Sequence, residues 1–423
     1  CALGSPALTD CSFAFNSASL RGGGMVNNQL STPTLTNCTF LENTAPTGGG
    51  IYNYDSSPNL TSCIFTDNTA TNGGAVGNSY SSIVLTDCNF TGNVAIGVGG
   101  GVFNDNTTAT VTTCLFQENA SERGGGMCNY SSNVVIADSI FENNSATIVN
   151  SYTGGGGMYN GGSTLSMTTC TFNNNQAQAG GAMDCHGSSA SIINSNFTNN
   201  VAQVNGGGFY CSSSDVVIAD SVLENNVAEV GDGFYVWIGS LNFVGTNSID
   251  EIYLYHWAYS NSRLDFLTDT YCYVTNDVTT PYGGSTTFDI NNLVTDETLT
   301  VGWEFIRAGA LGITNDSNSL FAANVDDIVP LVQASTLSGS FSSVTLPAMP
   351  DGLGLQLIEQ EAPRGADTEI AVQVIEVEGA NFANPFEGDL DSPPVDMVSF
   401  DADGDGVDEI ALLFGGNPGG VAV

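Results

Sequence analysis

Acidic residues crowd into one short segment near the C-terminal end of this 423-residue chain. From Asp401 to Glu409 the carboxylates occupy positions 1, 3, 5 and 9, and a glycine occupies position 6. This spacing lets one tight loop wrap oxygen atoms around a hard cation, and calcium fits such a ligand set. Leu412 stands at position 12, where an EF-hand needs a bidentate acid. The segment therefore predicts a calcium loop of another kind, and an empty acidic turn is the alternative.

The same stretch resembles the calcium loop of FG-GAP or VCBS-type repeats, in which a short apolar strand follows the loop. Residues 410–415 have the composition of that strand. Only one such repeat is present, so a propeller is not implied. The resemblance implies this set of calcium ligands: the side chains of Asp401, Asp403, Asp405 and Glu409, and the carbonyl of Val407.

Residues that could catalyse a reaction do not converge in the sequence. Cleavage of a polysaccharide needs a base beside a uronate or a pair of acids. Arg21 and Arg123 lie four repeats apart, and His186, beside Asp184, is predicted to be a surface or corner residue. Stacking of successive repeats could bring two pairs of acids together, Glu42 with Asp67 and Glu118 with Glu142. We predict that these acids lie at bends and are solvated. We therefore predict no catalytic residues.

A cluster of aromatic residues follows the last repeat. It includes Tyr255, Trp257 and Tyr259. These side chains are candidates for contact with a glycan, because sugars stack on aromatic rings. The alternative is a cap that closes the end of the repeat region with bulky side chains and prevents edge pairing.

Six cysteines share one repeat position, two residues before a phenylalanine, and serine fills it in three other copies. The six are Cys11, Cys38, Cys63, Cys88, Cys114 and Cys170. Exchange with serine predicts a ladder of small side chains rather than a metal array. Cys185 and Cys211 occupy equivalent positions one repeat apart and form the best candidate disulfide, because the expected Cα spacing suits one. The sequence leaves the pairing open.

All of these residues are positioned by a repeat of about 25 residues. The pattern Phe-x-x-Asn, followed by a Gly-Gly element and an apolar residue, recurs nine times within residues 1–234, with Leu223 replacing phenylalanine in the last copy. The asparagines are Asn16, Asn43, Asn68, Asn93, Asn119, Asn144, Asn175, Asn200 and Asn226. Such a period indicates a solenoid, in which each unit buries its apolar face against its neighbours.

The residue types specify which solenoid forms. The repeats are rich in Thr, Asn, Ser, Val and Gly and contain no helical pattern, so short strands are expected. The sequence predicts an all-β fold, a right-handed parallel β-helix of nine to ten rungs over residues 1–249. Each corner asparagine should point inward and bond its equivalent one rung away, and each double glycine should mark a second corner. A cap and strand-rich connection is expected over 250–330 and an acidic, β-rich region over 331–423.

The paired motifs resemble the repeats of polymorphic outer-membrane proteins, which are β-helical passengers of surface-exposed autotransporters, many of them adhesins. The resemblance covers residues 5–234. It implies the architecture and a surface location, whereas the transporter barrel of that family has no counterpart here. The chain begins in the middle of a rung, which suggests that further rungs precede Cys1; a lipoprotein-type N-terminal cysteine is the alternative.

The composition indicates a secreted protein. With 44 acids, five Arg and no Lys, the net charge of −39 disfavours binding to nucleic acid or anionic membranes. Residues 1–245 contribute −14 and residues 246–423 contribute −25. No apolar run reaches transmembrane length. We therefore expect an extracellular, non-catalytic structural protein, a subunit of a filament or surface layer that associates end to end. A glycan-binding adhesin is the second hypothesis, and a polysaccharide-degrading enzyme is the third.

Overall fold

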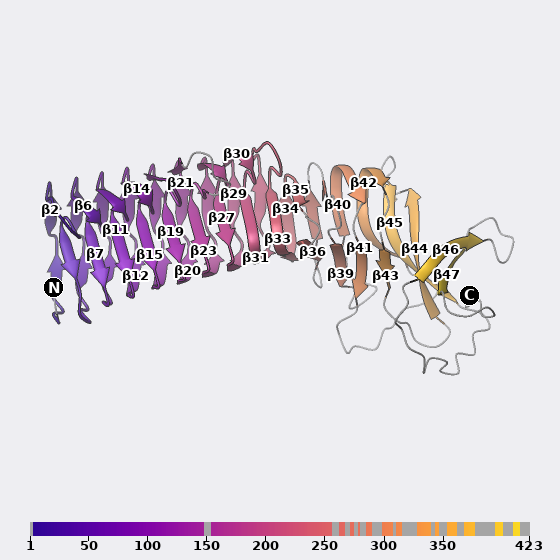
Figure 1. The fold of residues 1–423 in the computed structure, drawn as a ribbon, viewed down its shortest axis with the longest axis horizontal. Coiled ribbons are helices and arrows are strands. Elements are labelled where there is room, and N and C mark those ends of the chain that lie inside the picture. Colours follow the sequence, from indigo (N-terminus) through magenta and orange to yellow (C-terminus); the bar gives the residue numbers. More distant parts are fainter. Residues whose placement is uncertain are drawn as a thin grey trace. The chain divides into compact units, whose positions relative to one another are not determined.

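The computed structural model describes residues 3–147 and 154–255, the strands between 262 and 376 with position 346, and two strands of the C-terminal segment. Residues 1–376 and 377–423 form two compact units. In the first unit, strands of successive rungs pair in parallel and in register, so that equivalent repeat positions form columns along a β-helix (Figure 1).

Each motif-bearing rung contains three main strand positions and a shorter fourth one. Strands that follow the glycine corner are β3 (Met25–Asn27), β7 (Ile51–Tyr54), β11 (Val76–Ser79), β15 (Val102–Asp105), β19 (Met127–Tyr130), β23 (Met158–Gly161) and β27 (Met183–His186). Strands of the second position are β1 (Ala7–Thr9), β4 (Thr34–Thr36), β8 (Asn59–Thr61), β12 (Ser82–Thr86), β16 (Thr108–Thr112), β20 (Asn133–Ala137), β24 (Thr164–Thr168) and β28 (Ser189–Ile193). Both positions are continuous in β31 (Phe209–Ala219) and in β33 (Phe234–Val244).

The third position holds the phenylalanine strands. These are β2 (Ser12–Ala14), β5 (Thr39–Leu41), β9 (Ile64–Thr66), β13 (Asn89–Thr91), β17 (Leu115–Gln117), β21 (Ile140–Glu142), β25 (Thr171–Asn173), β29 (Asn196–Thr198) and β32 (Val222–Glu224). A separate parallel sheet follows the corner asparagines and comprises β6 (Thr44–Thr47), β10 (Thr69–Asn72), β14 (Val94–Val98), β18 (Ala120–Ser121), β22 (Ser145–Ala146), β26 (Gln176–Ala179) and β30 (Val201–Asn205).

The core is a set of columns of identical or similar side chains. Phenylalanine rings of the third position stack from Phe13 to Phe172 with centroids 4.5–4.9 Å apart and nearly parallel planes. The strand spacing of about 4.8 Å sets this ring separation. Stacking therefore adds an aromatic contact to the burial of every ring.

The predicted ladder of corner asparagines is confirmed. In the rung of Asn93, the backbone N–H and the side-chain Nδ2 both donate to Oδ1 of Asn119, at 3.0 Å each. The Oδ1 of Asn93 accepts the same two bonds from Asn68, and its Nδ2 also donates to the carbonyl of Phe65. Asp250 ends the ladder by accepting the N–H of Asn226 at 2.7 Å. The side chains thus satisfy backbone groups that a bend leaves without strand partners.

A second ladder of buried asparagines lies two residues after the apolar residue of the glycine element. Each Nδ2 donates to the next Oδ1 at 2.7–2.8 Å. Its members are Asn27, Asn53, Asn78, Asn104, Asn129 and Asn160. Cys185 and Cys211 take the next two places in this column. Of this column, the two cysteines were the members singled out as a candidate pair from the sequence.

The glycine corner is required by backbone conformation and by close packing between rungs. Gly99 has a φ of 67°, a left-handed value that side chains disfavour. A Cβ atom on Gly100 would lie 2.3 Å from the carbonyl oxygen of Gly125 in the next rung. The predicted role of the double glycine is therefore confirmed at both positions.

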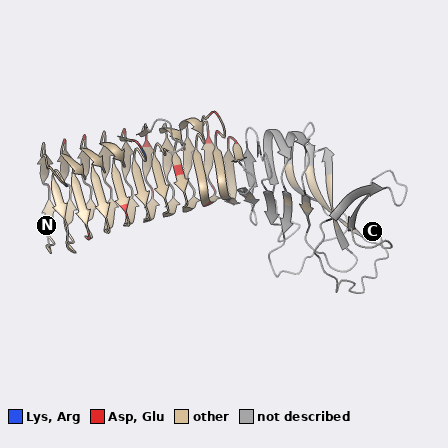
Figure 2. Ribbon diagram, viewed as in Figure 1, with Lys and Arg blue, Asp and Glu red and all other residues tan. Residues whose placement is uncertain are grey.

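Acidic residues concentrate at the other bends. Asp10, Glu42, Asp67, Asp87 and Asp138 are among those with a left-handed φ, and Figure 2 shows the acids of the described rungs in red. Asp and Asn tolerate this conformation better than most residues. The bends also place their charges in solvent, at the edges between the faces of the β-helix.

Parallel pairing continues past residue 249, where the sequence suggests a boundary. The Asn motif disappears there, but strands still pair in parallel as far as Thr345. They are β34 (Thr246–Ile249), β35 (Ile252–Tyr255), β36 (Ser262–Phe266), β37 (Tyr271–Val274), β38 (Val278–Thr279), β39 (Ser285–Asp289), β40 (Thr298–Arg307), β41 (Ala310–Thr314), β42 (Ile328–Gly339) and β43 (Ser343–Thr345). The described strands of the expected cap region are thus further turns of the β-helix.

An antiparallel pair covers this end of the first unit. Strand β45 (Thr368–Glu376) pairs antiparallel with β42, and β44 (Leu353–Glu361) pairs antiparallel with β45. In the second unit, β46 (Pro394–Phe400) and β47 (Glu409–Phe414) form an antiparallel pair of their own.

Candidate functional site

One rung carries a buried carboxylate where other rungs carry aromatic or small residues. Asp184 lies in β27, in register with Tyr159 of β23 and Tyr210 of β31. Its side chain is fully buried, and one carboxylate oxygen accepts the N–H of Gly154 at 2.7 Å. The other oxygen lies 3.0 Å from Nε2 of His186, whose side chain is 27% exposed.

The strand geometry explains the Asp184–His186 pair. Side chains two residues apart on a strand point to the same side, so Asp184 and His186 both face away from the apolar core. Burial raises the pKa of Asp184, whereas the contact with His186 opposes that rise. The histidine thus provides a polar partner for a carboxylate that water does not reach.

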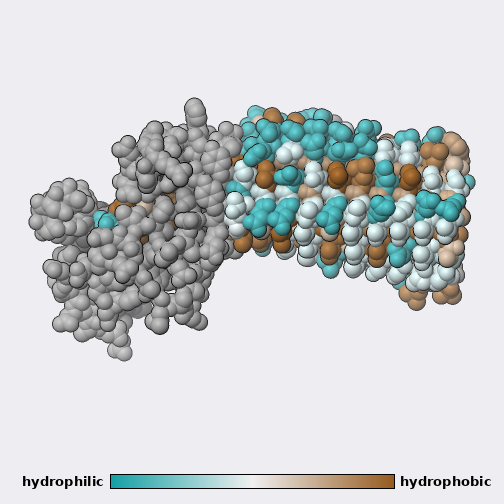
Figure 3. All heavy atoms as spheres, turned by 180° about the vertical axis from the view of Figure 1, so that it is seen from behind, coloured by the Kyte–Doolittle hydropathy of each residue, from teal (hydrophilic) through white to brown (hydrophobic). Residues whose placement is uncertain are grey.

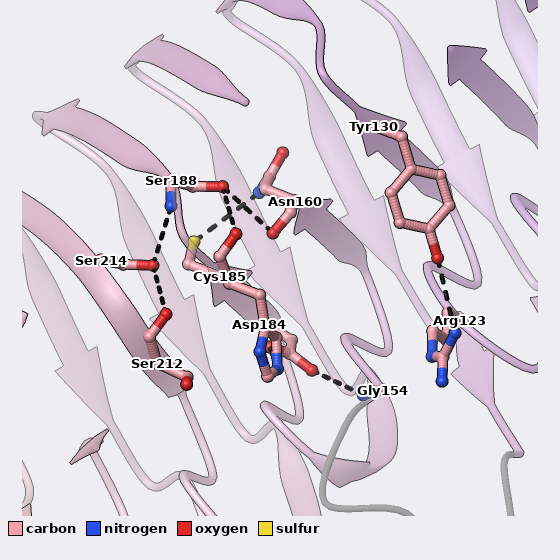
Figure 4. A network of polar contacts seen from close by, with 10 residues as sticks. Arg123, Tyr130, Gly154, Asn160, Asp184, Cys185, Ser188, Ser212 and Ser214 are labelled. Atoms are coloured by element: carbon pink, nitrogen blue, oxygen red, sulfur yellow. Dashed lines mark hydrogen bonds and ion pairs between the residues drawn. The ribbon is translucent and has the colours of Figure 1, made fainter. Parts of the chain in front are cut away.

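Arg123 lies two rungs before Asp184, next to Tyr130 (Figure 4). Its Nη1 donates to the hydroxyl of Tyr130 at 3.5 Å, and its guanidinium lies 5.8 Å from the ring centre of Tyr159. Burial raises the pKa of Tyr159, with the charge of Asp184 adding to the shift, so this phenol stays protonated at neutral pH. Arg21, the other arginine of the motif-bearing rungs, lies over Tyr52 and is not part of this group. The expectation that the two arginines do not converge is confirmed.

His186 also belongs to a row of aromatic rings along the β-helix. Neighbouring centroids in the row are 5.3–6.0 Å apart. Its members, here called the aromatic row, are Phe103, Tyr130, Tyr159, His186, Tyr210, Tyr235 and Tyr253. At its end, Tyr210, Tyr235 and Tyr253 stack with nearly parallel planes. These ring faces cover one another, and Tyr210 and Tyr235 are buried, so the stacked part of the row packs as part of the structure.

This geometry limits the chemistry of the site. Asp184 can orient His186, and the partly exposed imidazole can contact a molecule at the surface. Asp184 itself is too deeply buried to contact a substrate. Sequence reasoning placed His186 correctly at the surface but missed its carboxylate partner. The available signal was an aspartate in a column of aromatic residues.

The structure does not form the disulfide that the sequence suggested. Cys185 and Cys211 are in register, but both thiols are free. Their Cα spacing suits a disulfide, whereas in-register neighbours keep their Cβ atoms about 4.8 Å apart, beyond the usual 3.5–4.5 Å. Cys185 instead accepts a hydrogen bond from Nδ2 of Asn160 at 3.8 Å, and burial raises the pKa of its thiol to about 12.

The predicted ladder of small side chains is confirmed for the other cysteines. They are buried from Cys38 onward, and the equivalent serines are buried as well. The thiol of Cys88 donates to the carbonyl of Thr86, and its hydrogen bond with Cys114 raises its pKa to about 12. In the described part of the chain, no three His, Cys, Asp or Glu side chains are arranged to hold a metal ion.

The predicted calcium and glycan residues fall mostly outside the described residues. Asp401, Asp403, Asp405 and Val407 lie outside them, and Glu409 is the first residue of β47. Phe400 and Glu409 are paired, so the two ends of the acidic loop lie side by side. Trp257 and Tyr259 also lie outside the description, and only the backbone of Tyr255 is described, in β35.

Comparison with known proteins supports the architecture. Residues 25–197 match a family model described as a right handed beta helix region. The solenoid is thus a right-handed parallel β-helix, as its sequence predicts. This match supports neither polymorphic outer-membrane protein repeats nor an FG-GAP calcium loop. Neither a curated protein nor a solved structure matches the chain significantly. No described helix has the length and hydropathy to span a membrane.

Proposed function

We propose that this chain is an extracellular, non-catalytic structural protein that works as a self-associating subunit of a filament or surface layer. The observation that carries the proposal is the unbroken corner ladder from Asn16 to Asp250. Every rung is joined to the next by side-chain bonds as well as by strand pairing. Such a segment resists bending and local opening, which is the property required of a structural spacer.

The charge is consistent with this role. A chain of −39 repels nucleic acid and anionic polysaccharide, and it repels its own copies at low ionic strength. Association should therefore require salt, divalent cations or a surface with few charges. Electron microscopy of the native material tests the proposal, because regular assemblies support it and uniformly single particles at high concentration and high salt contradict it.

End-to-end association remains a prediction. At one end of the first unit, β45 lies against β42, and β44 lies beyond β45. A second copy therefore cannot pair a parallel strand with the residues of β42 that already pair with β45. End-to-end contact at this end would have to use β44 or its neighbours.

An adhesin that binds a glycan is the second candidate, and the aromatic row is the observation that favours it. Three members of the row are buried, Tyr159, Tyr210 and Tyr235. A glycan would therefore have to contact partly exposed members of the row, among them Phe103, Tyr130 and His186. Saturable binding on a glycan array, lost in Tyr130→Ala, would establish this function. The enzyme hypothesis rests on Asp184 and His186, and release of sugar fragments that stops in His186→Ala would establish it.

We also propose that the loop at 401–409 binds calcium. The antiparallel pairing of β46 and β47 supports the idea, because it places Phe400 and Glu409, the residues at the two ends of the acidic segment, side by side. Crowded carboxylates repel one another unless a cation lies between them. The proposed ligands are the side chains of Asp401, Asp403, Asp405 and Glu409 and the carbonyl of Val407.

Replacing both Asp403 and Asp405 by alanine tests this site. The wild-type chain should gain thermal stability in the C-terminal unit when calcium is added, and the double variant should lose that gain. Calorimetry with and without a chelator measures it, and circular dichroism of the β-helix serves as the control. A double variant with a wild-type calcium response would place the site elsewhere among the acids of residues 246–423.

A further inference from the structure

One face of the β-helix differs from the rest of this acidic protein. It consists of the outward side chains of β4, β8, β12, β16, β20, β24 and β28 and of residues 215–219 and 240–244, and is here called the neutral face. Outward and inward positions alternate along these strands. On the neutral face, Asp215 is the only charged residue, and the others are Thr, Ser, Asn, Val, Ala and Ile.

Acids border this face on one long edge. Asp87, Asp138 and Asp220 lie at the bend after the second strand position, each with a left-handed φ. Between the bends, apolar side chains remain in solvent: Val84 and Ile193 are each 38% exposed and Val135 is 44% exposed. Exposed residues on the described rungs lie in rows that run along the β-helix, as Figure 3 shows for the side seen there.

We propose that the neutral face is a lateral docking surface for a second copy of this chain. This inference rests on the proposed self-association and names the surface that performs it. A neutral face allows two chains of charge −39 to approach where Asp215 is the only ionised group to be desolvated. A positively charged partner would be drawn instead to the acidic bends.

The dimensions of the face suit this partner. Nine strands at about 4.8 Å and about five residues at 3.3 Å each give roughly 700 Å² of flat area. Stable interfaces bury about 800 Å² on each partner, so the face approaches the size that a dimer needs. A second copy also has the same rung spacing, and its side-chain rows can match those of the first over the whole length.

The charge distribution selects an antiparallel arrangement with a two-fold axis. Within the first unit, residues 246–376 carry 18 acids and three Arg, a net charge of −15, and the rungs that follow residue 245 lie beyond one end of the neutral face. Parallel copies would bring these acidic ends together, whereas antiparallel copies keep them apart. The axis then passes near β20, the middle of the nine strands, and Val135 contacts its equivalent in the second copy.

The first experiment compares two aspartate variants in one rung. Val135 and Ile140 are 44% and 42% exposed, on β20 and β21, but only Val135 lies on the neutral face. Val135→Asp places two like charges in contact and should raise the dissociation constant of the dimer about 100-fold. Ile140→Asp is the matched control and should leave the constant unchanged. Sedimentation velocity measures both, and circular dichroism verifies that both variants fold.

Salt provides a second measurement on the wild-type chain. Screening of the acids should strengthen the dimer between physiological and molar sodium chloride. If the Val135→Asp variant self-associates as tightly as the wild type, the neutral face is not the interface, although self-association itself still stands. A chain that stays monomeric at high concentration in both salts would overturn the docking surface and the proposed function together.

Cysteine cross-linking tests the orientation. In the antiparallel arrangement Val84 on β12 lies opposite Ser191 on β28, three places from each end of the matched rows. A mixture of the Val84→Cys and Ser191→Cys chains should form a mixed disulfide under mild oxidation, and Val135→Cys should cross-link to itself. Cross-linking of Val84→Cys to itself, without the mixed product, would overturn the antiparallel arrangement.

Discussion

The two ends of the phenylalanine strands follow different rules although both are bends with continuous ladders. At the end after the phenylalanine, asparagine occupies every motif-bearing rung. At the end before it, some rungs carry cysteine and others carry serine, and the column continues through both. The asparagine of one rung takes part in bonds with both neighbouring rungs and with a phenylalanine carbonyl.

The cysteine or serine at the other bend makes fewer hydrogen bonds. The thiol of Cys114 donates to the carbonyl of Thr112, and the N–H of Cys114 donates to Oγ of Ser139 at 3.1 Å. The N–H of Cys88 reaches Sγ of Cys114 at 3.4 Å in the same way. A small side chain that donates once and accepts once is sufficient here. The number of groups that a side chain must satisfy therefore decides whether its identity is fixed.

The largest expected effect is at the asparagine end. Asn93→Ala removes the acceptor for two donors of Asn68 and the donor for the Phe65 carbonyl, all buried. Leaving such groups unpaired should lower the free energy of unfolding by roughly 3 kcal/mol. The midpoint of chemical denaturation measures the loss. An unchanged midpoint would mean that the side chain contributes nothing and that the comparison between the two bends fails.

The end of the same ladder should make stability depend on pH. Asp250 accepts the N–H of Asn226 in the place of an asparagine, and burial raises its pKa. In the folded state it therefore holds its proton to higher pH than in the unfolded chain. Its contribution to stability is full below the unfolded pKa, about 3.9, and falls as the pH rises toward the folded pKa.

Asp250→Asn isolates this effect. The amide keeps an acceptor oxygen for Asn226 but cannot ionise, so the variant should lose this pH dependence and be more stable than the wild type at neutral pH. Denaturation midpoints of both proteins from acidic to neutral pH give the difference. A difference that stays constant, or that favours the wild type as the pH rises, would contradict the raised pKa.

Sequence reasoning captured features that repeat with one residue type. Phenylalanine, the corner asparagine and the double glycine recur at fixed spacing, so their columns could be predicted. The second ladder was missed because Cys185 and Cys211, which follow its last asparagine in the same column, suggested a disulfide. The pair of Asp184 and His186 was missed because burial of a single residue depends on the chain around it, not on a repeat.

The later rungs escaped prediction for a related reason. Their strands still pair in parallel, as β33 does with β36, but no asparagine marks the bends. Apolar residues such as Leu241, Leu264 and Leu311 continue the buried column, each at most 1% exposed. Strand pairing needs only backbone groups and an apolar inner face, so a rung can persist after its motif is lost.

The smallest expected effect is at the cysteine end. Serine already occupies the column at 139, 195 and 221, where its hydroxyl accepts the N–H of the preceding rung at 3.1 Å and donates to a nearby carbonyl. Cys88→Ser keeps one donor and one acceptor in a slot of suitable size, so the free energy of unfolding should change by less than about 1 kcal/mol. Cys88→Ala is the matched control, because it removes the donor to the carbonyls of Leu60 and Thr86, and it should cost more than the serine variant. Equal denaturation midpoints for the serine and alanine variants would show that this column needs only a small side chain. A serine variant as damaged as Asn93→Ala would show instead that sulfur packing fixes this bend as strongly as hydrogen bonding fixes the other.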